Sequence, residues 1–226
     1  VGTSAFAHKA GLHASAIKVD PMMYQHETPE SVGNDMRMLV SEMAGRASIE
    51  LKSVELGIDL GGDKDLISRV VEKVKDLEGK GFTFEAADAS FELLLRTEVS
   101  GKRPSFFTIE DWQTTVHQDE LGKVTSKATV KISAKGEVIT ASGVGNGPVN
   151  AIDNALRNGL EKFYPELSKL ELTDYKVRIL EGRLGTGAVT RVLVETSDGN
   201  GEWSTVGVHE NVIAASAMAL DDAVTY

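Results

Sequence analysis

The stretch ATVKISAKGEVITASGVGNGPVNAIDNALRNGL, residues 128–160, indicates the fold of the second half of the chain. It begins with alternating apolar and polar residues, turns at Lys135-Gly136-Glu137, and ends in a segment with apolar residues at helical spacing. Alternation is typical of a half-buried strand, and spacings of three and four are typical of an amphipathic helix. The stretch therefore predicts a β-hairpin followed by a helix, with Asn146 as the expected N-cap and Pro148 in the first turn.

The same plan returns further along the chain. Val192 and Val194 precede the turn at 198–202 as Val130 and Ile132 precede the turn at 135–137. The second turn is likewise followed by an apolar helix, which begins near Asn211. With one strand before each hairpin, the plan is two copies of three strands and a helix. One copy alone leaves a sheet face and a helix stripe uncovered, so we expect the copies to pack around a pseudo-twofold axis.

The first half of the chain has helical periodicity instead. Helices are expected over 41–56, 63–78 and 85–99, and the second has the clearest apolar stripe, formed by Leu66, Ile67, Val70, Val71, Val74 and Leu77. The polar, Gly- and Pro-containing segment 101–104 lies where the apolar pattern changes from helical spacing to the alternation of a strand.

These patterns predict an α+β chain in two parts. Residues 1–102 form a linker region, with a helix-and-loop arm over 1–32 and a small helical subdomain over 33–102. Residues 103–226 form the duplicated βββα domain.

Composition excludes several classes of function. The net charge of -10 opposes binding to nucleic acid or to an anionic membrane. The chain has no cysteine, which is consistent with a reducing cytoplasm. No apolar run is long enough to span a bilayer. The opening residues resemble neither a signal peptide nor an initiator sequence, so we expect the chain to be part of a larger protein.

Several ordered motifs carry a family resemblance. The segments 4–13, 29–34 and 41–46 resemble the linker of the citramalate and isopropylmalate synthases, and the segments 143–151 and 174–177 resemble their regulatory domain. The resemblance implies a catalytic barrel, absent from this chain, in which a divalent metal and acetyl-CoA are expected. No metal site and no cofactor are therefore expected in this chain, which by itself should not turn over.

The resemblance also implies catalytic residues that act in trans. In this family the linker sends a histidine and a tyrosine into the barrel of the partner subunit, and the motif positions are His13 and Tyr24. Both side chains can donate hydrogen bonds to a developing alkoxide or exchange protons with it. Without the resemblance, each would be interpreted as an ordinary surface or interface residue. His8, five residues before His13, is a weaker candidate for a catalytic role.

The Gly-rich turn at 143–147 has two readings. It could be a tight turn that needs glycine, or a place where backbone N–H groups bind an anion. The resemblance implies that it lines an inhibitor pocket at the interface of a homodimer. The pocket positions are Gly145, Gly147, Asn150, Tyr175 and Ile179, although Tyr175 could equally be a core aromatic residue.

The sequence therefore predicts the linker and feedback-regulatory part of an acetyl-CoA-dependent 2-oxoacid synthase that binds a branched-chain amino acid, with isoleucine as first choice. The motifs at 7–13 and 174–180 are closer to the citramalate branch than to the isopropylmalate branch. The alternatives are a 2-isopropylmalate synthase, a stand-alone amino-acid-binding dimerisation module, and a purely structural dimer.

Overall fold

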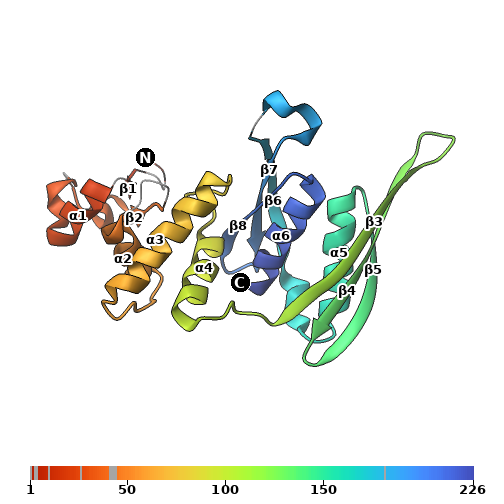
Figure 1. Ribbon diagram of the computed structural model, residues 1–226, viewed down its shortest axis with the longest axis horizontal. Coiled ribbons are helices and arrows are strands. Elements are labelled where there is room, and N and C mark those ends of the chain that lie inside the picture. Colours follow the sequence, from red (N-terminus) through yellow and green to blue (C-terminus); the bar gives the residue numbers. More distant parts are fainter. Residues whose placement is uncertain (1, 3–4, 10, 26, 41–44, 181) are drawn as a thin grey trace. The chain divides into compact units, whose positions relative to one another are not determined.

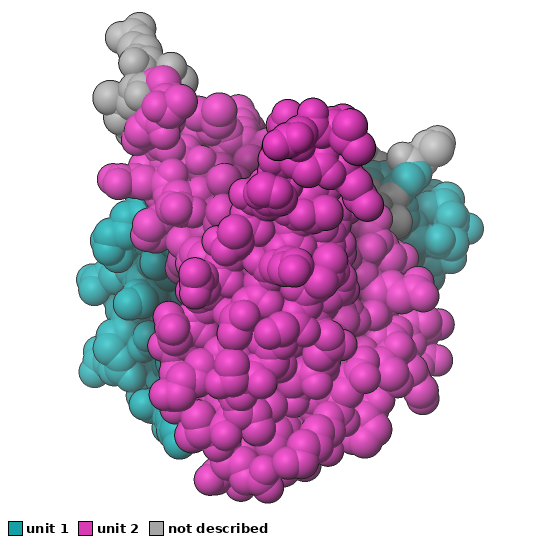
Figure 2. Space-filling model, turned by 90° about the vertical axis from the view of Figure 1, so that its right-hand side faces the viewer, with its two compact units in different colours: residues 1–103 teal, residues 104–226 magenta. Residues whose placement is uncertain are grey.

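The computed structural model describes residues 1–226 except 1, 3–4, 10, 26, 41–44 and 181. The chain divides into two compact units, Val1–Arg103 and Pro104–Tyr226, which are coloured separately in Figure 2. No helix of the described residues is long and apolar enough to cross a membrane.

The first unit is mostly helical. A short strand pair joins β1 (Ala7–His8) and β2 (Arg37–Met38) in parallel. The helices are α1 (Gly11–Val19), η1 (Pro21–Met23), η2 (Pro29–Val32), α2 (Arg46–Glu55), α3 (Lys64–Gly79) and α4 (Asp88–Ser100).

Helix α3 shows why the sequence prediction succeeded here. The side chain of Asp63 accepts hydrogen bonds from the backbone N–H groups of Asp65 and Leu66, which caps the helix start. The inward side of the helix buries Leu66, Ile67, Val70 and Val74. The helices predicted over 63–78 and 85–99 are confirmed with small shifts of their ends. Of the helix predicted over 41–56, residues 41–44 lie outside the described residues.

The second unit contains two three-stranded antiparallel sheets, each followed by a helix. The first copy is β3 (Phe107–Gln118), β4 (Val124–Ala134), β5 (Glu137–Gly145) and α5 (Pro148–Leu160). The second copy is β6 (Glu171–Ile179), β7 (Thr190–Ser197), β8 (Glu202–His209) and α6 (Val212–Thr225). The 3-10 segments η3 (Pro165–Lys169) and η4 (Gly182–Gly187) lie between these elements. The predicted α+β fold with a duplicated βββα order is confirmed.

The two copies also share finer features. Each has a register irregularity in its first strand, between Ile109 and Asp111 and between Leu172 and Asp174. In each, a glycine of the third strand touches the helix that follows. A Cβ on Gly143 would lie 2.4 Å from the Ala155 nitrogen, and one on Gly207 would lie 1.9 Å from the Ala215 oxygen.

A single core joins the copies. Helices α5 and α6 contact each other and lie between the two sheets (Figure 1). Both copies contribute buried side chains to this core, among them Val130, Ile132, Leu156, Leu160, Val192, Val194, Ala219 and Leu220. Each copy thus covers apolar surface that the other would leave in water.

The expected N-cap of α5 was wrong by one residue. The cap position is Gly147, not Asn146, and Gly147 has no side chain that could accept a hydrogen bond from the first turn of the helix. The Asn146 N–H instead donates to Asn150 Oδ1 at 3.2 Å, so Asn146 belongs to the preceding turn.

Candidate functional site

A cavity of about 910 Å³ opens at the start of α5. Its wall includes three of the predicted pocket residues, Gly147, Asn150 and Tyr175, which come from the start of α5 and from β6. Leu172 of β6 and Leu220 of α6 add apolar surface. The cavity therefore combines elements of both copies.

The helix start within this cavity offers unpaired donors. The first backbone N–H groups of an α-helix have no partner inside the helix, and Pro148 has no N–H at all. With Gly147 at the cap, the N–H groups of Val149 and Asn150 have no side-chain cap among the described residues. The start of α6 differs, because the Asn211 side chain accepts from the N–H groups of Ile213 and Ala214. Of the two equivalent helix starts, only that of α5 lacks such a cap.

Tyr175 presents a hydroxyl held in a defined orientation. Its oxygen lies 2.8 Å from Ser216 Oγ, and the Ser216 hydroxyl donates to the Val212 carbonyl at 2.6 Å. Because the Ser216 hydroxyl already donates its hydrogen to the Val212 carbonyl, the Tyr175 hydroxyl is the donor in its bond to Ser216. The Tyr175 oxygen can then still accept a hydrogen bond from a ligand.

A largely buried ion pair, Asp153–Arg157, forms another part of the wall and was not predicted from the sequence. Arg157 Nε lies 2.9 Å and 3.0 Å from the two carboxylate oxygens of Asp153. Burial raises the pKa of Asp153, and Arg157 opposes that rise. The Arg157 guanidinium also donates to the Leu170 carbonyl, and at 3.5 Å to that of Leu167. The opposite charges four residues apart on one helix were the available sequence signal.

Two of the predicted pocket residues, Gly145 and Ile179, do not line this cavity. A Cβ on Gly145 would lie 2.5 Å from the Ala151 nitrogen, so packing of the strand against the helix is a sufficient reason for glycine there. Ile179 is 59% exposed at the end of β6.

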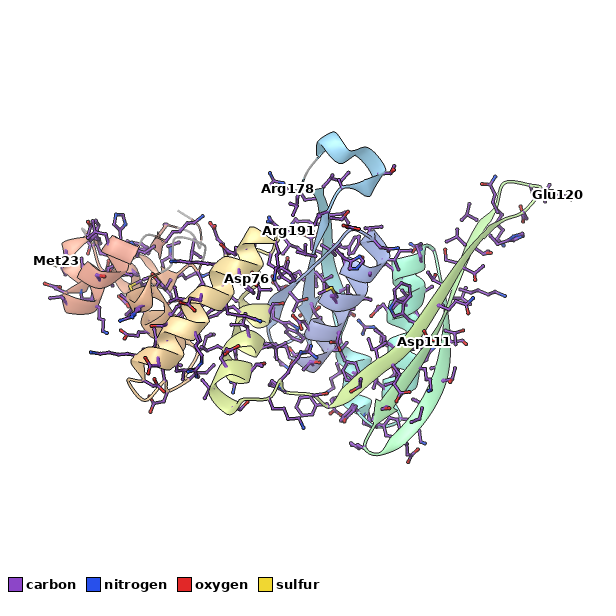
Figure 3. All side chains as sticks on the ribbon, viewed as in Figure 1. Met23, Asp76, Asp111, Glu120, Arg178 and Arg191 are labelled. Carbon is purple, nitrogen blue, oxygen red and sulfur yellow. The ribbon has the colours of Figure 1, made fainter. Side chains whose placement is uncertain are left out.

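Ile179 belongs to an exposed apolar stripe with Tyr175 and Val177, which alternate onto one face of β6. Arg178 lies opposite Arg191 across β6 and β7, and Figure 3 labels both. By the same alternation they belong to the other face of the sheet. One face of this strand is therefore apolar and accessible, which is typical of an interaction surface.

In the first unit, the two predicted catalytic side chains lie together. The rings of His13 and Tyr24 are stacked with centroids 4.1 Å apart and planes 29° apart. His8 meets His13 edge-on at 6.4 Å, and its Nε2 lies 3.5 Å from Gln25 Nε2. Partial burial, and to a lesser degree His13, lower the pKa of His8. Tyr24 is 40% exposed. It directly follows Met23, which Figure 3 labels.

The described residues include no group of three or more His, Asp or Glu side chains that could hold a metal ion. The motif residues Ser4, Ala10 and 41–44 lie outside the described residues.

Comparison with known proteins gives two family matches. Residues 85–226 match the family described as the LeuA allosteric (dimerisation) domain. Residues 1–81 match the family described as the homocitrate synthase post-HMGL domain-like region.

Curated relatives match along the whole chain. An (R)-citramalate synthase of Streptomyces coelicolor is 66% identical over all of this chain and 42% of its own length. An (R)-citramalate synthase of Geobacter sulfurreducens is 44% identical over all of this chain and 43% of its own length. A 2-isopropylmalate synthase of Methanocaldococcus jannaschii is 28% identical over 99% of this chain and 41% of its own length. The chain thus spans less than half the length of these relatives.

Proposed function

The chain belongs to the family of the LeuA allosteric (dimerisation) domain, and we propose that it is the linker and feedback-regulatory part of an acetyl-CoA-dependent 2-oxoacid synthase. The proposed reaction of the whole protein is that of (R)-citramalate synthase, which joins acetyl-CoA to pyruvate. The relatives at 66% and 44% identity support this choice over a 2-isopropylmalate synthase, whose relative is 28% identical.

The proposed effector is a branched-chain amino acid, with isoleucine first. The observation that carries this proposal is the cavity that joins an uncapped helix start to a tyrosine hydroxyl and apolar side chains. A carboxylate suits the N–H groups of Val149 and Asn150, because these donors and the helix dipole favour negative charge. An ammonium group can donate to the Tyr175 oxygen, and an aliphatic side chain can contact Leu172 and Leu220.

The proposed assembly is a homodimer. The exposed stripe of Tyr175, Val177 and Ile179 continues from the cavity wall along β6, and a second copy would remove it from water. Gly147 supports the effector proposal, because a Cβ there would meet no described atom within 4 Å. The space in front of Gly147 is open to an effector.

The proposed coupling links the effector to catalysis through the linker. An effector that binds better to one packing of the paired regulatory domains would shift His13 and Tyr24 relative to the partner's barrel. A coupling free energy of about 1–3 kcal/mol is typical of such regulation. The divalent metal and acetyl-CoA are proposed to bind in the barrel, outside this chain.

The experiment is a thermal-unfolding screen of this chain against isoleucine, leucine, valine and lysine. A ligand that binds only the folded state at a hundred times its Kd stabilises it by about 2.7 kcal/mol. Isoleucine should raise the melting temperature most and lysine should raise it less, because only an aliphatic side chain suits contact with Leu172 and Leu220. No shift with any branched-chain amino acid would reject the sensor and leave a structural dimer.

A further inference from the structure

The first unit contains a buried lysine that the function proposed above does not use. Lys52 of α2 is 1% exposed. Its Nζ lies 2.8 Å from Glu55 Oε1 and 3.1 Å from Asp88 Oδ1, so two carboxylates balance its charge. The Arg37 guanidinium donates to Asp88 Oδ2 at 3.2 Å. These four residues, Arg37, Lys52, Glu55 and Asp88, form the Lys52 cluster.

The Lys52 cluster fixes positions more effectively than it stabilises a core. Taking opposite charges out of water costs about as much as their attraction returns, and a well-packed apolar side chain stabilises a core as well or better. A buried charge that loses its partners is strongly destabilising, so the partners must stay in place. The elements that supply them, α2, α4 and β2, are thus fixed relative to one another.

The cluster holds the short strand pair of β1 and β2. Each strand has only two residues, and a ribbon of two strands is at best marginally stable by itself. The N–H groups on either side of Met38 donate across the pair to the β1 side. The N–H of Met38 itself donates to Glu55 Oε2 at 3.3 Å. The cluster therefore binds β2 through a backbone group and through the Arg37 side chain.

Strand β1 leads directly to the rings that are proposed to act in catalysis. His8 of β1 meets His13 edge-on with ring centroids 6.4 Å apart, and His13 is stacked on Tyr24 at 4.1 Å. Helix α1, which carries His13, packs against α2 (Figure 1), and Lys18 of α1 forms an ion pair with Glu50 of α2. Two attachments of the arm therefore end on α2, the helix of the buried lysine.

Asp88 connects the cluster to the regulatory part of the sequence. It is the first residue of α4 and lies in the region that matches the allosteric domain, whereas Arg37 and Lys52 lie in the region that matches the other family. The contacts of Asp88 with Arg37 and Lys52 thus join residues of the two matched regions within the first unit.

We propose that the Lys52 cluster positions the rings of His13 and Tyr24, with Asp88 as its link to α4. Its members act through β2 and β1, so they are positioning rather than catalytic residues. The catalytic consequence rests on the proposed function, whereas the placement of the rings does not.

The test uses Asp88→Asn, because the Asp88 side chain is 35% exposed and its change leaves Lys52 paired with Glu55. Lys52→Met is less suitable, because it takes the buried cation away from both carboxylates. The matched control is Asp65→Asn. It also removes a carboxylate from the first turn of a helix in the same unit, but Asp65 does not belong to the Lys52 cluster.

The first readout is the ring-proton resonance of His13 in this chain, at a temperature at which each variant is folded. The chain has five histidines, so His13→Gln assigns the signal. The stacked Tyr24 ring shields these protons, and Tyr24→Ala gives the position of the unstacked signal. In Asp88→Asn the signal should move toward that position, and in Asp65→Asn it should stay where it is in the unaltered chain.

The second readout is the activity of the whole protein, barrel included. Asp88→Asn should lower kcat about tenfold with the KM for pyruvate nearly unchanged, because a misplacement of about 1 Å can slow a reaction roughly a hundredfold.

The outcomes separate positioning from stability and from catalysis. A folded Asp88→Asn chain whose His13 signal stays in place would overturn the proposal and make the cluster a purely structural ion-pair network. An equal movement in Asp65→Asn would overturn it as well. A moved signal with an unchanged kcat would support the positioning and would contradict the catalytic role proposed for His13 and Tyr24.

Discussion

Two glycines of one turn should respond in opposite ways to the same methyl group. In Gly145→Ala the new Cβ would lie 2.5 Å from the Ala151 nitrogen and 2.6 Å from Asn150 Oδ1. Ordinary contact begins near 3.4 Å, so β5 and the start of α5 must separate by almost an ångström. In Gly147→Ala the Cβ would meet no described atom within 4 Å, and the backbone φ of -153° suits alanine.

The expected magnitudes follow from these distances. Overpacking of this kind costs about 1–3 kcal/mol, so Gly145→Ala should lower the melting temperature by roughly 4–12 °C for a domain of about 100–200 residues. Gly147→Ala should leave the melting temperature nearly unchanged. Its methyl group would instead occupy the space where the effector carboxylate approaches, and a loss of about 1.4 kcal/mol would weaken isoleucine tenfold.

The assay is differential scanning fluorimetry of both variants with and without isoleucine, with calorimetry for the affinities. Gly201→Ala is the matched control, because a Cβ there also meets no described atom within 4 Å and Gly201 does not line the cavity. If Gly147→Ala unfolds as early as Gly145→Ala, or binds isoleucine as well as the Gly201→Ala control does, Gly147 does not face the effector.

Three further outcomes are expected. Arg157→Met should lower the free energy of unfolding by about 3–5 kcal/mol in urea denaturation, because it leaves the Asp153 carboxylate buried without its partner; a change below 1 kcal/mol would contradict this. Tyr175→Phe should cost about 1 kcal/mol of stability through the lost bond to Ser216, and unchanged stability would count against that bond. The folded-state pKa of His8 is lowered, so the unfolded chain binds a proton on His8 more readily than the folded chain does. The contribution of neutral His8 to folding stability is therefore present above about pH 6.5 and is lost as the pH falls through the lowered pKa. His8→Gln should therefore flatten the acid-side decline of stability, and an identical pH profile would show that His8 does not contribute.

The elements themselves could be predicted because their signals are local. The apolar stripe of α3 and the alternation of Val130 and Ile132 each depend on a few neighbouring residues, and the duplication emerged from comparing two such patterns. The cap of α5 was wrong because Asn146 has a favourable residue type, whereas the Asn150 side chain competes for the turn.

The site could be predicted only in part, because its contacts join distant segments. Tyr175 and Ser216 are 41 residues apart in sequence, and no periodicity predicts that pair. Gly145 and Gly147 look equivalent in the sequence, but only the structure shows that one packs against α5 and the other faces open space. A second cavity of about 390 Å³, lined in part by Trp203, combines residues from before β3, from η3, from β8 and from the end of α6, so no local motif indicates it.

The most direct measurement is the rate of condensation of acetyl-CoA with pyruvate by the whole protein, barrel included, as isoleucine is added. Isoleucine should inhibit the unaltered protein, and Gly147→Ala should need about tenfold more isoleucine for the same fractional inhibition. A rate that isoleucine leaves unchanged, or an inhibition curve that Gly147→Ala does not move, would contradict the claim that the cavity at the start of α5 is the sensor.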